Sequence, residues 1–363
     1  MDKSTNELLK LINEGKNVNE ISEITKLSNK VIFGRINMLR NAGYIFKKLY
    51  YSDGNIVYSN GSDMIWYDEK YNGTNLIVDG KNGKQIDAIA ISDIHFGSAY
   101  EIEGIMDKIY NYCINNDIHI ILFGGDLVDG TFGKWRRINN IDEQLTYIMQ
   151  KYPFDKSIIN FGVLGNHDYS IFKANSRDIS LILNNYRHDI VPLGYFIGKL
   201  NIGNDTLTFL HGSKRNYLSY KNRNIIPYIT SNNMDRKSIV LRGHTHKMFT
   251  ITEDDFHVCI NLPSISGMRD KDEFLPSAIR IRISLNNDTF SHIIINQLLI
   301  KKKIHSINEF KQSFTSCKKQ DYCDSLEKIN YNEFTELSDF MDVDDDEIDF
   351  EKQANPKTLI KKL

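Results

Sequence analysis

Aspartate, asparagine and histidine side chains recur in short clusters, and each cluster follows an apolar run of the sequence. In chain order the clusters are Asp93-x-His95, Gly125-Asp126-x-x-Asp129, Gly165-Asn166-His167-Asp168, His211-Gly212 and Gly243-His244-x-His246. Residues i and i+2 of an extended segment point to the same side, so Asp93 and His95 can reach one cation from the end of a strand. One such pair is weak evidence. Five clusters in this order predict a shared metal site.

The mixture of carboxylate and imidazole groups suits divalent ions such as Mn, Fe, Zn or Ni. Two such ions held ~3.5–4 Å apart can clamp the attacking and the leaving oxygens of a phosphoryl transfer. They also lower the pKa of a bridging water, so that hydroxide forms near neutral pH. The glycines in the clusters allow the chain to turn sharply off each strand. We therefore expect two metal ions, most simply Mn, and phosphoester hydrolysis.

The clusters resemble the D-x-H, G-D-x-x-D, G-N-H-D/E, H and G-H-x-H pattern of the calcineurin-like metallophosphoesterases, over about residues 87–297. The resemblance implies an α/β (α+β) fold, a four-layer α/β/β/α sandwich with the metals at the carboxyl ends of the strands. It also implies a role for each residue. Asp93, His95 and His246 would bind one metal, and Asn166, His211 and His244 the other.

Three further residues of the pattern have separate roles. By the same resemblance, Asp126 would bridge the two metals. His167 would contact the scissile phosphate or protonate the leaving oxygen, and Asp168 would orient His167. Asp129 belongs to the motif, but we expect it beside the ligands as a supporting or helix-capping residue.

Two departures from the family pattern bear on the substrate. Leu164 and Gly130 stand where the phosphoprotein phosphatases have phosphate-clamping arginines. The stretches ISDIHFGS and GDLVDG instead resemble the nuclease branch of the family. We therefore expect hydrolysis of phosphodiester bonds in nucleic acid. The alternatives are a phosphomonoesterase or small-nucleotide phosphodiesterase, and a DNA-binding regulator that retains the phosphoesterase fold.

Basic residues near the second and fourth clusters are candidate substrate contacts, because cations and an aromatic side chain suit a nucleic-acid backbone and a stacked base. They are Lys134, Arg136 and Arg137, beside Trp135, and Lys214 and Arg215. A solvated loop is the alternative interpretation of each stretch.

Residues 1–60 are expected to form a separate module. Helices are predicted from Ser4 or Thr5 to Gly15, over 18–26 and over 30–41, followed by strands 44–51 and 55–59 around an Asp-Gly turn. This order resembles the winged helix-turn-helix family, in which the third helix reads a DNA groove. The candidate nucleic-acid contacts are Lys30, Arg35, Arg40, Lys47 and Lys48. Docking to a protein, or dimerisation, is the alternative.

Residues 61–86 are expected to be a connector, with strands at 64–67 and 75–78. Apolar strands then alternate with amphipathic helices from residue 87 to 299, which favours an α/β domain. The predicted strands are 87–92, 118–124, 157–164, 205–210, 238–242, 257–261 and two within 277–297, and the predicted helices are 101–116, 138–151 and 178–186.

Residues 300–363 are expected to be a disordered tail, because residues 321–350 contain twelve acidic residues and one lysine. A protein partner for this tail is the alternative. The formal net charge of −2 excludes a global attraction to nucleic acid or membrane. The four cysteines form no C-x-x-C pair. With no signal peptide or membrane span in the sequence, we expect a cytoplasmic protein. The oligomeric state stays open.

Overall fold

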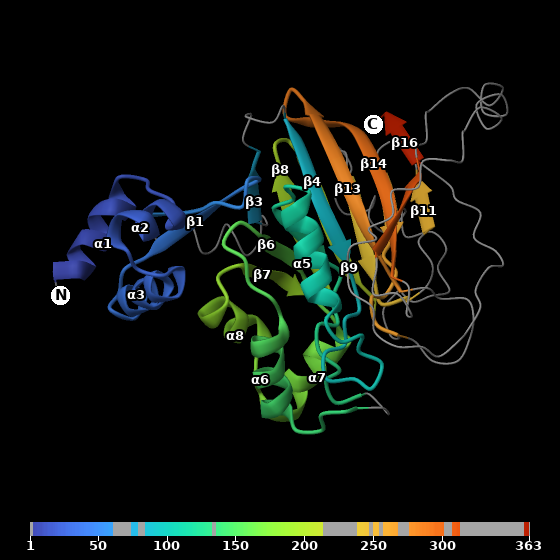
Figure 1. Ribbon diagram of the computed structural model, residues 1–363, viewed down its shortest axis with the longest axis horizontal. Coiled ribbons are helices and arrows are strands. Elements are labelled where there is room, and N and C mark those ends of the chain that lie inside the picture. Colours follow the sequence, from blue (N-terminus) through green and yellow to red (C-terminus); the bar gives the residue numbers. More distant parts are fainter. Residues whose placement is uncertain are drawn as a thin grey trace.

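The computed structural model describes residues 3–60, 74–78, 84–132, 136–212, 238–246, 250–253, 257–267, 276–300, 307–312 and 359–362. Within these ranges the strands form two sheets, here called sheet A and sheet B, that pack against each other (Figure 1). This confirms the expected two-sheet sandwich. No helix in the described ranges is long and apolar enough to cross a membrane.

Sheet B has the order β15-β14-β13-β4-β5-β6-β7, and β16 also pairs with β14. Its strands are β4 Gln85–Ile91, β5 Ile120–Phe123, β6 Ile159–Leu164, β7 Ile190–Tyr195, β13 Ser277–Asn286, β14 Thr289–Ile300, β15 Ile307–Gln312 and β16 Leu359–Lys362. Strands β4 to β7 are parallel. In β5, Ile120 and Leu122 face the core between the sheets, whereas Ile121 and Phe123 face the helices. Burial on both faces explains the uninterrupted apolar runs of the sequence.

Sheet A has the order β11-β12-β10-β9-β8-β3-β1-β2. Its strands are β1 Phe46–Tyr51, β2 Ile56–Asn60, β3 Thr74–Ile77, β8 Ile197–Ile202, β9 Asp205–His211, β10 Ser238–Gly243, β11 Thr250–Glu253 and β12 His257–Asn261. Strands β9, β10 and β12 are parallel, so their carboxyl ends lie at one edge.

Four helices cover the outer face of sheet B: α5 Ile105–Asn115, α6 Ile141–Lys151, α7 Asn166–Asn175 and α8 Ile179–Tyr186. Asn140 and Asp178 cap α6 and α8 by accepting backbone hydrogen bonds. The outer face of sheet A carries no helix in the described part of the chain. The expected second helical layer therefore stays a prediction for this protein, and residues 213–237 lie outside the described ranges.

The N-terminal helices are α1 Lys3–Asn13, α2 Val18–Thr25 and α3 Asn29–Asn41. The order of three helices and a hairpin is as predicted, and membership of the winged-helix family stays a prediction. Asn17 caps α2 in a reciprocal box with Glu20, and Ser28 caps α3. The hairpin does not stand apart, however. Strand β1 pairs with β3, which pairs with β8, so the module extends sheet A.

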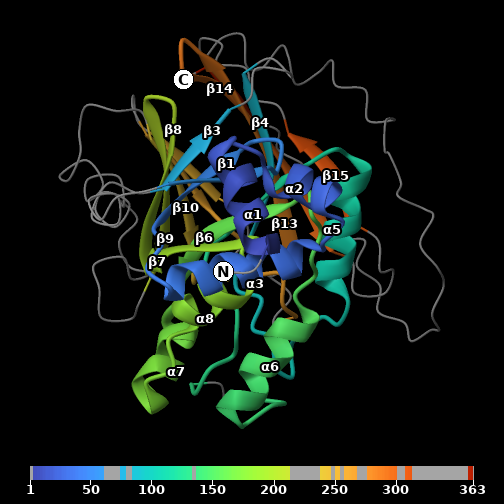
Figure 2. The same cartoon turned by 90° about the vertical axis from the view of Figure 1, so that its left-hand side faces the viewer.

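Helix α3 packs against the turn after α8 (Figure 2). The Phe33 ring stacks on the His188 ring with centroids 4.1 Å apart, and the Tyr58 hydroxyl lies 2.9 Å from His188 Nδ1. Asn37 donates a hydrogen bond of 2.8 Å to the Asn185 carbonyl. Burial, together with nearby Lys48 and Arg40, lowers the pKa of His188 to about 2. His188 is therefore neutral near pH 7 and packs in this contact without a charge.

Replacing Phe33 by alanine is expected to lower the free energy of unfolding by about 3 kcal/mol, because the buried ring loses its packing in the core and its stacking on His188. Met38 lies on the same helix and is 68% exposed, so Met38→Ala serves as the control and should change stability by less than about 0.5 kcal/mol. Urea titrations of the two variants test this. Equal effects would mean that the contact with His188 adds no stability.

The structure corrects the expected tail at two points. Residues 307–312 and 359–362 form strands β15 and β16, both paired with β14. The acidic stretch between them, residues 313–358, lies outside the described ranges, as does the predicted strand 64–67. Helix α7 and strands β7, β8 and β11 are present in the structure without having been predicted.

Candidate metal centre

The five clusters meet at one edge of the sandwich. Asp93, Asp126 and Asn166 follow the parallel strands β4, β5 and β6 of sheet B. His211 ends β9, and His244 directly follows the parallel neighbour β10 in sheet A. The carboxyl ends of both sets of strands thus deliver their side chains to one place.

Five of the predicted ligands have left-handed backbone conformations. Their φ angles are 54° at Asp93, 52° at His95, 54° at Asp126, 76° at His244 and 52° at His246. Each non-glycine residue in this region costs of order 1 kcal/mol or more. Hydrogen bonds from Asp93 N to Gly125 O and from His95 N to Asp126 O, both 3.0 Å, hold the first two turns. The fold therefore stores strain at the residues predicted to bind metal.

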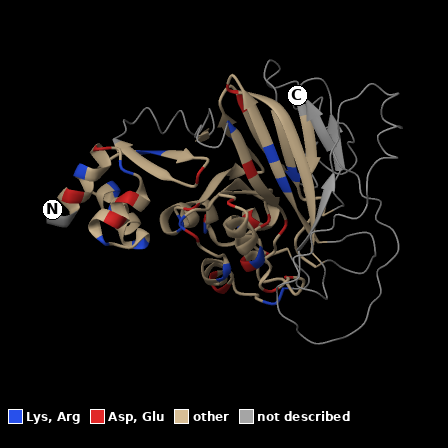
Figure 3. Ribbon diagram, turned by 45° about the horizontal axis from the view of Figure 1, so that its top comes forward, with Lys and Arg blue, Asp and Glu red and all other residues tan. Residues whose placement is uncertain are grey.

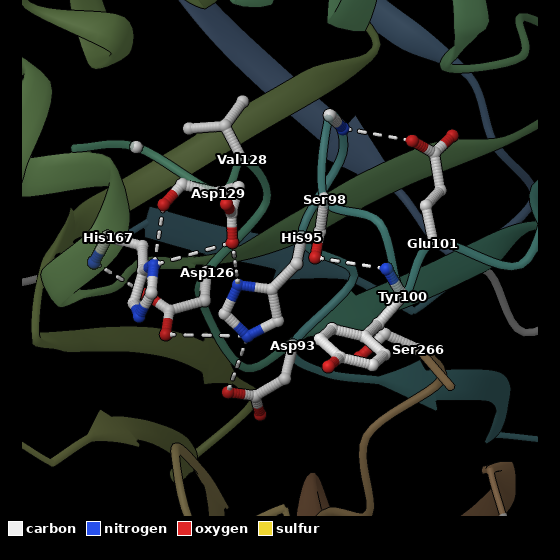
Figure 4. A network of polar contacts seen from close by, with 12 residues as sticks. Asp93, His95, Ser98, Tyr100, Glu101, Asp126, Val128, Asp129, His167 and Ser266 are labelled. Carbon is white, nitrogen blue, oxygen red and sulfur yellow. Dashed lines mark hydrogen bonds and ion pairs between the residues drawn. The ribbon is translucent and has the colours of Figure 1, made fainter. Parts of the chain in front are cut away.

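The first donor group consists of Asp93, His95, Asp126 and His246, whose ligand atoms all lie within 4.8 Å of one another. His246 Nε2 lies 3.0 Å from Asp93 Oδ1 and 3.2 Å from His95 Nε2. His95 Nε2 is 3.9 Å from Asp93 Oδ1 and 4.0 Å from Asp126 Oδ2, so the ring lies between the two carboxylates (Figure 4). These are the residues predicted for one metal, together with the predicted bridge.

The second donor group consists of Asp126, His211 and His244. His211 Nε2 lies 3.1 Å from Asp126 Oδ2 and 3.2 Å from Asn166 Oδ1. Its Nδ1 donates a hydrogen bond of 2.6 Å to the Gly124 carbonyl. This bond fixes the tautomer in which Nε2 faces the carboxylate, as in histidines that bind metals. Asp126 belongs to both groups, which is the geometry that a bridging carboxylate requires.

The carboxylate oxygens themselves test whether this site fits metal ions. Asp93 Oδ2 accepts hydrogen bonds from Ser92 Oγ and His244 N, and Asp126 Oδ1 accepts one from His167 N. The second oxygens, Asp93 Oδ1 and Asp126 Oδ2, are buried and face imidazole nitrogens, His246 Nε2 at 3.0 Å and His211 Nε2 at 3.1 Å. Buried carboxylate oxygens are costly without positive charge beside them, and here that charge can come from a protonated imidazole or from a metal ion. The donor set therefore fits two divalent ions.

A family model described as calcineurin-like phosphoesterase matches residues 87–248. These residues form a calcineurin-like phosphoesterase domain. No curated protein matches the chain.

Similar solved structures include Vps29 complexed with Zn²⁺ from Entamoeba histolytica, which is 16% identical with a TM-score of 0.38 over 62% of this chain and 97% of that one. Vps29 from Cryptosporidium parvum is 14% identical, with a TM-score of 0.39 over 61% and 94% of the two chains. GAP50 of the inner membrane complex of Plasmodium is 14% identical, with a TM-score of 0.35 over 61% and 86%.

In the phosphoesterase domain, burial and the neighbouring carboxylates shift the pKa values of the histidines in the two donor groups. Burial lowers the pKa of His211, but Asp126 outweighs it and raises that pKa to about 9. The pKa of Asp126 is correspondingly held well below its usual value, against the effect of burial. In contrast, burial lowers the pKa of His95 to about 3 and that of His244 to about 4. His95 and His244 are therefore neutral near pH 7, ready to act as ligands.

Metal binding to this domain is expected to release protons and to tighten as the pH rises from 7 to 9. A metal ion requires a neutral His211, which carries a proton below its pKa of about 9. Each pH unit below that value should therefore cost about tenfold in apparent affinity. Calorimetric titration with Mn²⁺ at pH 7, 8 and 9, in two buffers of different ionisation enthalpy, measures both effects. An affinity that does not change over this range would contradict a proton on His211.

His167 is held by a backbone carbonyl. Its Nδ1 donates a hydrogen bond of 2.6 Å to the Asp129 carbonyl, and the Asp129 carboxylate lies 3.9 Å from the same nitrogen and 3.8 Å from His95 Nδ1 (Figure 4). These three residues form a further group with metal-ligand spacing. This bond leaves Nε2 of His167 as the nitrogen available to a ligand, and a role for His167 at the substrate stays a prediction.

The structure corrects the expected role of Asp168. Its carboxylate accepts backbone hydrogen bonds of 2.8 Å from Gly165, 3.2 Å from Leu127 and 3.0 Å from Val128. It therefore joins the second and third clusters and caps α7, while the Asp129 carbonyl orients His167. A backbone carbonyl has no signature in a sequence, so the sequence could not reveal this contact.

Phe196 is a second feature that the sequence did not reveal. It lies between β7 of sheet B and β8 of sheet A, and its φ of 67° is unusual for an aromatic residue. Its N–H donates to the Leu164 carbonyl at 2.8 Å, and its carbonyl accepts from His211 N–H at 2.7 Å. This residue therefore ties the strand end that precedes Asn166 to the strand end that carries His211.

The candidate substrate contacts have mixed outcomes. Lys134, Lys214 and Arg215 lie outside the described residues, as does Trp135. Arg137 pairs with Glu101 at 2.8 Å and lies over the Tyr147 ring, and Glu101 also accepts the Gly97 N–H. The Arg137 side chain thus links the loop between β4 and α5, which contains Glu101, to Tyr147 of α6. Arg136 is described and half-buried, and its contact with substrate stays a prediction.

The candidate nucleic-acid contacts of the N-terminal module lie on α3 and β1. Both signs of charge occur on the module, but α2 carries only acidic charges and α3 only basic ones (Figure 3). Arg40 and Lys48 lie close enough to His188 to affect its pKa, so they border the contact with the phosphoesterase domain. Lys30 is exposed, and Arg35 and Lys47 are half-buried. Nucleic-acid binding by these five residues stays a prediction.

Proposed function

We propose that this protein hydrolyses phosphodiester bonds in nucleic acid with the aid of two divalent metal ions. The observation that carries the proposal is the pair of donor groups that share Asp126. Bound there, two ions would supply an activated water and would neutralise charge that develops on the phosphate. Mn²⁺ suits the mixed oxygen and nitrogen donors best, with Fe, Zn and Ni as alternatives.

His167 is the proposed general acid of the reaction. With Nδ1 bonded to the Asp129 carbonyl, the ring can turn only Nε2 towards a substrate. When protonated, Nε2 can donate a hydrogen bond to a phosphate oxygen or deliver its proton to the leaving oxygen. The backbone N–H of His167 meanwhile bonds to Asp126 Oδ1 at 2.9 Å. The acid and the bridging carboxylate thus have a fixed separation.

Gly130 supports a diester rather than a phosphoprotein as substrate. Its φ is 62°, and an added Cβ would lie 2.2 Å from the His167 carbonyl oxygen and 2.4 Å from Ser170 Oγ. No side chain fits there, so the arginine that phosphoprotein phosphatases have at this position is excluded by packing as well as by sequence. With fewer cations to hold a dianionic monoester, the site favours a singly charged diester.

A panel of substrates tests this proposal. The purified chain with Mn²⁺ is expected to hydrolyse bis(p-nitrophenyl) phosphate and single- or double-stranded DNA or RNA much faster than p-nitrophenyl phosphate. Strong turnover of the monoester with intact DNA and RNA would replace the nuclease proposal by the phosphomonoesterase alternative. Loss of hydrolysis on adding a chelator, and its return with Mn²⁺, would establish the metal requirement.

A further inference from the structure

Phe132 is an exposed aromatic side chain next to His167. The two ring centroids are 5.9 Å apart and the planes meet at 88°, and the Phe132 side chain is 58% exposed. A lone exposed apolar residue is common on protein surfaces and needs no explanation by itself. The position of this one matters, because it contacts the proposed acid of the reaction.

The loop that carries Phe132 is bonded to two helices. The buried Gln144 side chain of α6 accepts the Gly130 N–H at 2.9 Å and donates to the Gly130 carbonyl at 3.0 Å. The Thr131 N–H donates a bond of 2.8 Å to Ser170 Oγ of α7, the helix that begins at Asn166 and His167. The chain is therefore fixed up to the residue before Phe132. The exposed ring is held beside His167 rather than at the end of an unsupported loop.

We propose that Phe132 stacks on an aromatic ring carried by the leaving alcohol of the substrate, which in nucleic acid is the base of the departing nucleotide. This inference rests on the proposed function. If His167 protonates the leaving oxygen, a ring that contacts His167 lies on the leaving-group side of phosphorus. Stacking on an aromatic side chain suits every base, since each has a π face. Phe132 would thus make the enzyme prefer nucleoside leaving groups without choosing a sequence.

The experiment compares dinucleotides that differ in one base. The substrates are thymidylyl-thymidine and its two analogues, in which either nucleoside is replaced by an abasic tetrahydrofuran. With Mn²⁺, wild-type protein should show a KM about tenfold higher for one of the two analogues than for the parent dinucleotide. In Phe132→Ala, the KM of the parent should rise by a similar factor, so that the parent and that analogue have similar KM values. Phe132→Trp should stay within about threefold of wild type. Phe154 is 53% exposed and lies in the loop before β6, so Phe154→Ala controls for general effects of losing a surface phenylalanine.

The possible results separate the two proposals. An unchanged KM in Phe132→Ala, or a fall in kcat alone, would overturn stacking, because the latter result would mean that Phe132 only positions His167. If Phe132→Ala raised the KM tenfold for bis(p-nitrophenyl) phosphate but not for the dinucleotide, the ring would bind aryl esters, and stacking on a nucleobase would be overturned. Absence of diester hydrolysis by wild-type protein would overturn the proposed function and this inference together.

Discussion

Replacement of Asp126 by asparagine is expected to remove both metal ions and to lower kcat by roughly a thousandfold or more, since several kcal/mol of charge stabilisation disappear. Asp126 Oδ2 faces His95 and His211, whereas Oδ1 accepts the His167 N–H. An asparagine would turn its oxygen to that N–H. Its amino group would then point at the position where the metals need an anionic oxygen.

Metal content after dialysis against buffer, measured by mass spectrometry alongside kcat, tests this expectation. Asp117→Asn is the matched control, because Asp117 carries the same chemical group and its side chain is 80% exposed. The control should retain wild-type metal content and turnover. Two tightly bound ions per chain in Asp126→Asn would contradict the bridging role.

Replacement of His167 by alanine is expected to lower kcat by about 10²–10⁴-fold while both metal ions stay bound. The reason is that His167 is the proposed acid, whereas Asp93, Asp126, His211 and His246 belong to the two donor groups that are expected to hold the ions. His292→Ala, on the exposed side of β14, is the control for loss of an imidazole.

Metal analysis of the same variant decides between two roles. Because His167 also forms a group with His95 and Asp129 that has metal-ligand spacing, loss of one ion in His167→Ala would make it a ligand and contradict its assignment as acid. Retention of both ions with unchanged kcat would contradict any role in the reaction.

The donor groups of the candidate metal centre were largely predictable from the sequence, because their chemistry is local to each cluster. Asp93, Asp126 and His246 follow apolar runs long enough to be recognised as buried strands, and parallel strands bring their ends together. Their left-handed backbones were not predictable, since they result from packing between neighbouring loops. The partners of Asp168 are three backbone N–H groups from two loops, and no spacing of residue types encodes such contacts.

Other parts of the fold escaped prediction for different reasons. Strand β7 contains Pro192 and Gly194, which weaken the strand pattern, but β7 is an edge strand of sheet B and so tolerates a proline. Helix α7 starts inside the Gly-Asn-His-Asp motif, where no helix was predicted. The contact made by Phe33 of α3 was not predicted either. Its stacking on His188 depends on a contact between residues more than a hundred positions apart.

The continuous sheet A has a consequence for where a long substrate would be cut. Strand β9 ends at His211 and β10 directly precedes His244, two predicted metal ligands, and the same sheet passes through β8 and β3 to the N-terminal hairpin. Backbone hydrogen bonds rather than a free linker therefore set the position of the module relative to the metals. If the module holds a nucleic acid that is cut at the metals, the distance between the binding site and the cleavage site would be fixed. The products would then have one defined length instead of a broad distribution.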